Sequence, residues 1–227
     1  IRHGWQDIIL RKGLVIFQFT IAIILITGTG IVLQQLRYIQ NRKLGLNKDQ
    51  VIEIGLKYAD LPKGQALVNE LIKKPGVVDA TLTDFPFKEG ISNIAILPEG
   101  AAQNEITSQS VISVDYDFLK TFQIPVVAGR DFSRSFGKDP DEAFIVNESA
   151  VKTFGWKKPG DAIGKNMNWG LGKKGKVIGV VKDFNFMSLH DNIKPLVIHI
   201  HPEWYRFVAI RIRPNDLSQT LKTIEET

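Results

Sequence analysis

The sequence LVIFQFTIAIILITGTGIVL occupies residues Leu14 to Leu33 and contains no charged side chain. In an α-helix a run of this length extends about 30 Å, which matches the hydrocarbon core of a bilayer. The run is longer than most buried helices of soluble proteins, and no small-residue cleavage pattern of a secretory signal follows it. Thr20, Thr27 and Gly30 share one broad helical face, where a second helix could approach closely. We therefore predict a transmembrane helix over residues 13–34.

The helix is expected to continue beyond the apolar run as a stalk over residues 35–47. Leu33, Leu36 and Ile39 keep helical spacing, and Gly45 is a suitable left-handed cap. We hypothesise that the stripe formed by these three apolar residues couples the membrane helix to whatever follows it. Lys and Arg residues occur on both sides of the span, so charge alone does not orient the helix in the membrane.

The composition of the remaining chain is that of a globular domain. Hydrophobic residues make up 44% of the sequence and charged residues 23%, and about 190 residues follow the span, enough for one large or two small cores. The net charge of +5 is scattered, without a basic stripe interleaved with aromatic residues, which argues against nucleic-acid binding. The absence of cysteine excludes disulfides, thiolate metal sites and a cysteine nucleophile.

Strand and helix patterns predict a mixed α+β fold with two lobes. Residues 51–56 and 77–83 read as strands around an apolar helical stripe that includes Leu67 and Leu71. Turn residues and short elements dominate from Phe85 to Gly175, and longer strands return at residues 176–182, 196–200 and 207–212. We predict that residues 48–84 and 176–227 form one βα lobe and that residues 85–175 are inserted as a small α/β lobe.

Several residues could suggest an enzyme, and each has a more ordinary interpretation. Residues 170–176 match most of a phosphate-binding loop, but a β-branched strand follows where a helix is required, so a basic, glycine-rich hairpin is favoured. His190, His199 and His201 could bind zinc, but no carboxylate at suitable spacing completes the set. Asp183 with His190 could be half of an acid–base pair, but no nucleophile accompanies them.

Two further segments have competing interpretations. The acidic residues Asp139, Asp141 and Glu142 are interpreted as a solvated loop. The segment Phe85, Pro86 and Phe87 is either an exposed apolar tip that contacts a partner or, as the favoured alternative, packing between the lobes. We predict no catalytic residue, no metal site and no cofactor.

An ordered series of short motifs resembles the periplasmic core domain of MacB-like and FtsX-like ABC transporter permeases. The resemblance covers nearly all of the chain and is to the two-half permeases of Bacteroidetes, in which a similar segment opens the second half of a longer polypeptide. The motifs are Val114-Asp115-Tyr116-Asp117-Phe118-Leu119, Gly129-Arg130-Asp131-Phe132, Ile145-Val146-Asn147-Glu148, Phe154-Gly155, Ile163-Gly164-Lys165, Val177-Ile178-Gly179-Val180-Val181-Lys182-Asp183-Phe184, Ser188-Leu189-His190 and Pro195.

The resemblance implies a bacterial inner-membrane protein with residues 1–12 in the cytoplasm and the domain after the span in the periplasm. It implies a porter-like lobe with an inserted lobe, ATP hydrolysis on a separate cytoplasmic subunit, and transmission of that motion for efflux, lipoprotein release or mechanical signalling. Expected partners are the ATPase, another permease half or a second copy, the lipid bilayer, and a periplasmic adaptor or lipoprotein. Further spans are expected after Thr227, so we interpret the chain as a fragment. The alternatives are a membrane-anchored sensor or binding module and, with less support, a tethered hydrolase.

Overall fold

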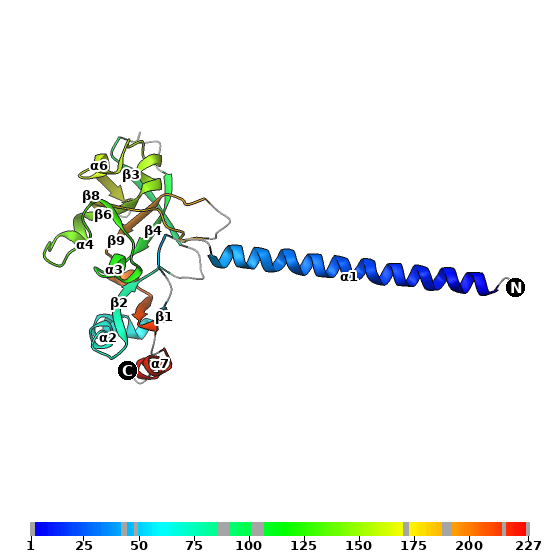
Figure 1. Ribbon diagram of the computed structural model, residues 1–227. Helices are drawn as coiled ribbons and strands as arrows, with labels where there is room; N and C mark the ends of the chain where they lie inside the picture. Colours follow the sequence, from blue (N-terminus) through cyan, green and yellow to red (C-terminus); the bar gives the residue numbers. More distant parts are fainter. Residues whose placement is uncertain are drawn as a thin grey trace. The chain divides into compact units, whose positions relative to one another are not determined.

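In the computed structural model the chain forms two units, residues 1–43 and residues 44–227. The first is built on helix α1, His3–Asn41, which is 39 residues long (Figure 1). The residues that the structure describes are 3–41, 45–47, 50–85, 91–100, 107–169, 173–187, 192–214 and 217–225.

Helix α1 has the length and composition to cross a membrane. Among the described residues one helix meets this test, over the 25 residues Arg11–Gln35, and every side chain of that segment is exposed in the chain by itself. The Thr20 and Thr29 hydroxyls each donate a 2.8 Å hydrogen bond to the carbonyl four residues earlier, so their polar atoms are satisfied within the helix. Such internal pairing is what a hydrocarbon environment demands.

The helix also extends beyond the apolar run, to Asn41. The stalk helix was predicted to continue through residue 47, but residues 45–47 are not helical. Gly45 has a φ of +79°, the left-handed conformation expected for it. Leu33 is half exposed, whereas the side chains of Leu36 and Ile39 lie outside the described part of the structure. The coupling role of these three residues therefore remains a prediction.

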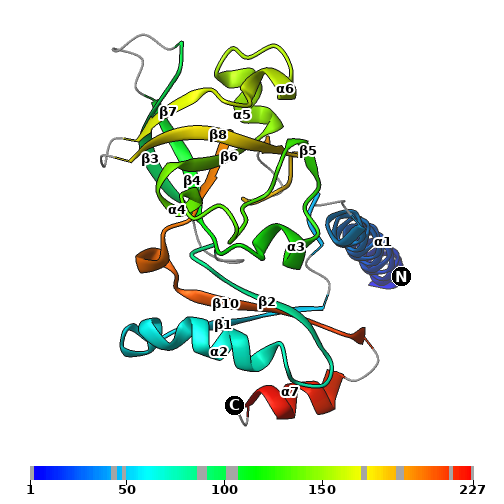
Figure 2. The ribbon, with the colours of Figure 1, turned by 90° about the vertical axis from the view of Figure 1, so that its left-hand side faces the viewer.

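A smaller lobe, hereafter the small lobe, is formed by a three-stranded antiparallel sheet in the order β1-β10-β2. Strands β1 and β2 flank β10 and are joined through α2, so the expected strand–helix–strand opening is present, split by a strand from the end of the chain. Figure 2 shows α2 and α7 on one side of this sheet, where Val68, Leu71 and Ile224 pack against β10. The elements are β1 (Val51–Gly55), the 3₁₀ helix η1 (Tyr58–Lys63), α2 (Gly64–Leu71), β2 (Val77–Thr83), β10 (Phe207–Ile212) and α7 (Leu217–Glu225).

The rest of the second unit, hereafter the large lobe, contains a mixed seven-stranded sheet in the order β5-β8-β6-β9-β4-β3-β7. Strand β7 pairs with both β3 and β8, so six of the strands close on themselves. The strands are β3 (Ser92–Pro98), β4 (Thr107–Ser113), β5 (Val126–Gly129), β6 (Ala143–Asn147), β7 (Asn166–Trp169), β8 (Lys174–Val181) and β9 (Leu196–His199). The helices are α3 (Phe118–Phe122), α4 (Asp139–Glu142), α5 (Glu148–Thr153), α6 (Pro159–Ala162) and the 3₁₀ helix η2 (Pro202–Trp204).

Hydrophobic clusters pack on both faces of the large sheet at β6. Along β6, Phe144 and Val146 belong to one hydrophobic cluster and Ile145 to another, as the alternation of side chains along a strand requires. Phe85 belongs to the second of these clusters, is only 3% exposed, and meets Phe118, Phe122 and Phe184 edge to face. The interpretation of Phe85 as part of an exposed tip is therefore wrong, while Pro86 and Phe87 lie outside the described residues.

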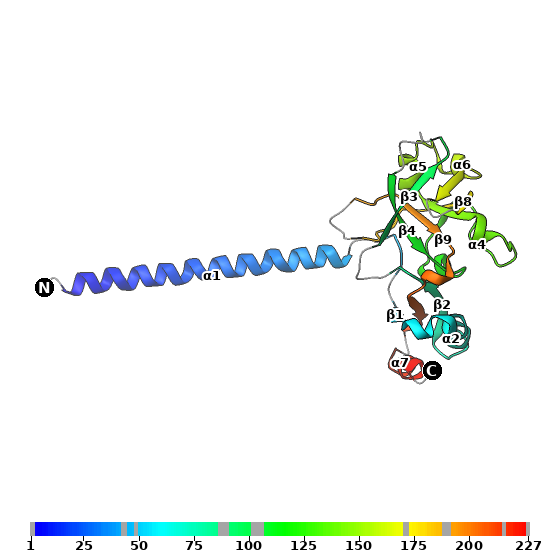
Figure 3. The ribbon, with the colours of Figure 1, turned by 180° about the vertical axis from the view of Figure 1, so that it is seen from behind.

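The predicted boundary between the lobes needs a correction. Residues 176–182 and 196–200 were expected to share a sheet with β1, but β8 and β9 belong to the large sheet. Figure 3 shows β9 beside β4 in the large lobe, and the two strands pair in parallel. The chain returns to the small lobe only at β10. Buried strands of both sheets carry the same apolar pattern, so the sequence could not distinguish their partners.

Candidate functional site

The two lobes are joined by two chain crossings that lie side by side. The outgoing crossing follows β2, where the Thr83 hydroxyl donates to the Ser113 carbonyl at 3.0 Å and the Ser113 N–H donates to Asp84 Oδ1 at 2.6 Å. The returning crossing precedes β10, where the Tyr205 hydroxyl donates to the Val114 carbonyl at 2.8 Å and the Arg206 N–H donates to the Thr83 carbonyl at 3.0 Å. The junction is therefore held by hydrogen bonds from both lobes.

Asp84 is the titratable group at the centre of this junction. Burial raises the pKa of its carboxyl group to about 7, and the Ser113 N–H and the Arg206 charge offset only part of that effect. The carboxyl group therefore changes its protonation state near neutral pH, at the point where the chain passes between the lobes.

The segment Gly45–Asn47, hereafter the entry segment, leads from the helix side into the folded domain and is packed closely. A Cβ atom on Gly45 would lie 2.5 Å from the Asp183 carbonyl oxygen and 2.8 Å from the Phe184 Cα, so only glycine fits there. Leu46 packs against the hydrophobic cluster that contains Phe85. The chain is thus fixed to the large lobe immediately where it enters.

Asn47 continues this attachment through hydrogen bonds to the end of α3. Its N–H donates to the Phe122 carbonyl at 2.9 Å, and its side-chain amide donates to Gln123 Oε1 at 2.9 Å. Gln123 has a φ of +53° and ends α3 in the left-handed conformation, which turns its side chain out of the helix. Asn47 thereby supplies a partner for a carbonyl group that the short helix leaves unpaired.

Arg211 connects the entry segment to the small lobe. It lies on β10, is 5% exposed, and its guanidinium donates from Nε to the Thr121 carbonyl at 2.5 Å and from Nη2 to the Asn47 carbonyl. A second contact between α3 and the small lobe is the 2.9 Å ion pair of Lys120 on α3 with Asp79 on β2. The guanidinium can hold two acceptors because its donors lie in a rigid plane.

The arrangement therefore brings three parts of the chain to one point: the entry segment, the end of α3 in the large lobe and the central strand of the small lobe. Sequence reasoning missed Arg211. The signal was present, because an arginine inside the apolar strand FVAIRI must find buried acceptors.

The residues considered for metal binding do not form a site in the described part of the chain, where no group of three His, Asp or Glu side chains occurs. His199 is fully buried against Trp169, and burial lowers its pKa to about 2, so the imidazole is neutral. His190 lies outside the described residues. Asp183 accepts hydrogen bonds from the Ser149 N–H and hydroxyl at 2.8 and 2.7 Å, so its carboxylate is bonded to the first turn of α5.

The other two enzyme-like segments are also accounted for. In the glycine-rich stretch Lys173 precedes β8 and residues 174–176 belong to it. β8 pairs with β7, as the hairpin interpretation predicts, while residues 170–172 lie outside the described part. The solvated-loop interpretation of the acidic segment is wrong for Asp139. Its carboxylate is buried and accepts two 2.7 Å hydrogen bonds from the Arg130 guanidinium, because a nearby arginine satisfied it inside the fold.

Comparisons with known proteins agree with this architecture. A family model described as MacB-like periplasmic core domain matches residues 14–226. The fold is similar to the periplasmic region of MacB from Actinobacillus actinomycetemcomitans, with a TM-score of 0.57, 14% identity, and coverage of 80% of this chain and 83% of that one. It is similar to the extracellular domain of the noncanonic ABC-type transporter YknZ from Gram-positive bacteria, with a TM-score of 0.52, 14% identity, and coverage of 75% and 88%.

A domain of a putative permease protein from Porphyromonas gingivalis is a more distant structural match, with a TM-score of 0.46, 18% identity, and coverage of 69% of this chain and 74% of that one. A comparison with curated protein sequences gives no match. The family match includes the apolar run, the entry segment and both lobes.

Proposed function

The chain belongs to the family of MacB-like periplasmic core domains, and from this premise we propose that it transmits ATP-driven movement from the membrane to an extracytoplasmic domain. As a member of this family it carries the extracytoplasmic domain of an ABC transporter permease. The transmission of movement is our inference, and it rests chiefly on Arg211, which ties the entry segment to α3 and to the small lobe at once.

The mechanism begins with a stiff helix. A displacement of α1 reaches the domain through the entry segment, and Asn47 is bonded both to α3 and to Arg211. Because a packed helix moves as a unit, a shift of a few ångströms at the bilayer would reach this point with little loss. The two crossings near Asp84 would then allow the lobes to change their relative position.

The proposed partners follow from this mechanism. A separate cytoplasmic ATPase subunit would supply the movement, and a second permease half or copy would pair with the membrane helix. The domain would lie on the periplasmic side of a bacterial inner membrane, where it could act on an adaptor or a lipoprotein. The consequence of the movement would be efflux, lipoprotein release or mechanical signalling.

The test inserts two glycines between Leu36 and Ile39 in the complete permease, assembled with its ATPase in lipid. Two glycines cost roughly 2 kcal/mol of helix propensity and rotate the following residues by about 200°. We expect ATP hydrolysis and membrane insertion to persist and transport to be lost. An Ala-Ala insertion causes the same rotation but keeps the helix stiff. Comparing the two variants therefore separates the effect of rotating the following residues from the effect of making the helix flexible.

Full transport by both insertion variants would contradict the proposal. The helix would then serve only as an anchor, and a membrane-tethered sensor or binding module would explain the domain better.

A further inference from the structure

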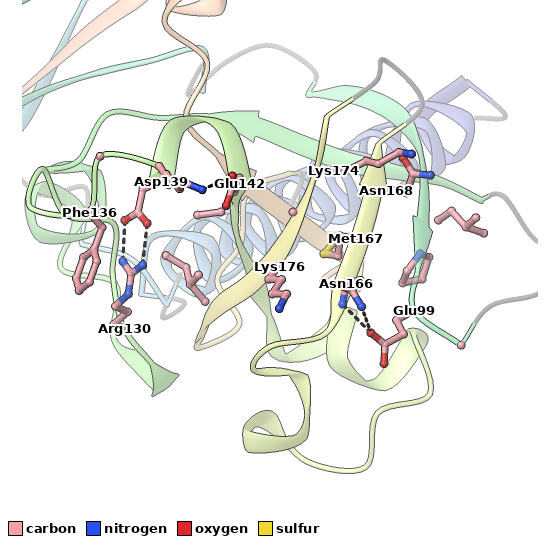
Figure 4. Close-up of a pocket in the computed structure, with 18 of the residues that line it drawn as sticks. Glu99, Arg130, Phe136, Asp139, Glu142, Asn166, Met167, Asn168, Lys174 and Lys176 are labelled. Atoms are coloured by element: carbon pink, nitrogen blue, oxygen red, sulfur yellow. Dashed lines mark hydrogen bonds and ion pairs between the residues drawn. The ribbon is translucent and has the colours of Figure 1, made fainter.

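A groove of about 1010 Å³ lies on the outer face of the β7–β8 hairpin in the large lobe. Figure 4 shows Lys176 at its centre, between the Arg130–Asp139 pair on one side and Asn166 with Glu99 on the other. None of the residues that line this groove takes part in the junction described above, so the groove is a separate feature of the domain.

The floor of the groove is a small array of hydrogen-bond donors. Asn166 lies opposite Lys176 and Asn168 lies opposite Lys174 in the antiparallel hairpin, and all four side chains are exposed. Met167 between the two asparagines is buried, so the four polar side chains share the opposite face. The Asn166 amide already donates to Glu99 Oε2 at 2.6 Å, so the donors considered for a ligand are those of Asn168, Lys174 and Lys176.

The carboxylates around the groove already have cationic partners. Asp139 pairs with Arg130 at 2.7 Å, Glu142 with Lys138 at 3.2 Å, and Glu99 with Lys165 at 2.8 Å. The hydrogen bond from Lys165 lowers the pKa of Glu99 to about 2, so this acid stays ionised in its pair.

Lys174 and Lys176 form no ion pair within the described ranges of the chain. The groove therefore carries an excess of two positive charges at its floor. An anionic ligand would gain from both, because like-charged side chains on one strand face repel each other until a counter-charge is present.

The walls of the groove add apolar surface. Phe136 is 51% exposed beneath the Arg130 guanidinium, whose central carbon lies 3.9 Å from the ring centroid, and Ile178 is partly exposed on β8. A small inorganic anion would leave these walls and most of the volume unused. The ligand that fits is an extended molecule with both negative charge and apolar side groups.

We propose that the groove binds an extended acidic segment of a partner protein, in which carboxylates on alternate residues pair with Lys174 and Lys176. The spacing supports this assignment. Residues two apart in an extended chain are separated by about 6.6 to 6.8 Å, for the bound segment and for β8 alike, so successive carboxylates meet successive lysines. Residues between the carboxylates would point away from the two lysines, so contact with Phe136 and Ile178 would come from apolar residues that flank the carboxylate pair.

The test measures fluorescence anisotropy of a labelled peptide that alternates Glu with Val, added to the full chain in nanodiscs of neutral phosphatidylcholine. We expect saturable binding that weakens as salt is raised. The Lys174→Gln/Lys176→Gln variant should lose about tenfold or more in affinity, whereas Lys152→Gln/Lys157→Gln, which removes two exposed lysines elsewhere on the large lobe, should lose less than about twofold.

A charge-swap pair makes the test independent of folding effects. Lys174→Glu/Lys176→Glu should bind a peptide that alternates Lys with Val and should no longer bind the acidic one. Equal binding of a peptide with the same composition but contiguous Glu residues would overturn the alternate-spacing argument. Capture of phosphatidylglycerol vesicles through the two lysines, without peptide binding, would overturn the proposal in favour of a lipid phosphate.

Discussion

Arg211 donates a hydrogen bond to the backbone carbonyl of Asn47, a residue that precedes it by 164 positions in the chain. This contact joins the central strand of the small lobe to the point where the chain enters the domain. The same guanidinium donates to the Thr121 carbonyl, so it also contacts α3 of the large lobe. One buried side chain therefore contacts both lobes and the entry segment, and the effect of removing it should be measurable.

The first prediction concerns Arg211→Met. This change leaves the carbonyls of Thr121 and Asn47 without their donor, and we expect it to lower the free energy of unfolding by about 2 to 4 kcal/mol. Urea unfolding of a fragment that begins at Leu44 measures the effect. Arg213→Met, at an exposed position next to the same strand, should change stability by less than about 0.5 kcal/mol. Equal effects of the two substitutions would show that Arg211 is not a structural tie.

The second prediction separates backbone strain from close contact at Gly45. Gly45 and Gly155 both have positive φ, +79° and +75°, but an added Cβ meets the Asp183 carbonyl oxygen only at Gly45. Gly155→Ala should therefore cost about 1 kcal/mol of strain. Gly45→Ala should cost about 2 to 3 kcal/mol, because a clash is added to a similar strain. Thermal unfolding of both variants provides the comparison, and similar melting temperatures would argue against close packing of the entry segment.

The third prediction is a pH dependence at the crossing between the lobes. Burial raises the pKa of Asp84 to about 7, against about 3.9 in the unfolded chain. Between these two values the folded protein holds a proton that the unfolded chain has lost, so the free energy of unfolding falls as pH rises through this window. Asp131, whose pKa burial raises to about 6, contributes with the same sign.

Asp84→Asn should remove part of this slope. The amide oxygen can still accept the hydrogen bond from the Ser113 N–H. We expect the free energy of unfolding of the variant, relative to that of the unmodified protein, to be higher at pH 8 than at pH 5 by about 1 to 3 kcal/mol. Urea unfolding at several pH values measures the slope. Asp161→Asn, at an exposed position, serves as the control. An unchanged slope in the Asp84 variant would mean that the carboxyl group is ionised in the folded protein.

The fourth prediction tests the position of Phe85. Its ring is buried among three other phenylalanines, so Phe85→Ala should cost about 3 to 5 kcal/mol of stability. Phe136→Ala removes a ring of the same size that is 51% exposed and should cost about 1 kcal/mol or less. Chemical unfolding of the two variants checks this. A stable Phe85→Ala protein would restore the idea that this residue serves a partner rather than the core.

The long apolar helix and several of the strands could be predicted from the sequence because their causes are local. An uncharged run of 20 residues matches the thickness of a bilayer. The strands predicted over residues 77–83 and 207–212 are present over the same residues. The hairpin interpretation of the glycine-rich stretch also depended on local pattern, since β-branched residues follow it. The family resemblance depended on several such local motifs in order along the chain.

The strand partners and the junction were decided only by the tertiary structure. β8 reads as the same kind of buried strand as β1, and its place in the large sheet depends on pairing with β5 and β6, which no local pattern encodes. The sequence predicts a solvated Asp139, but in the fold Arg130, nine residues away, donates hydrogen bonds to its buried carboxylate. Arg211 and Asn47 meet across 164 residues, and their contact exists because α3 positions the acceptors between them. Sequence determines what each segment can form, whereas burial and long-range hydrogen bonding determine which segments meet.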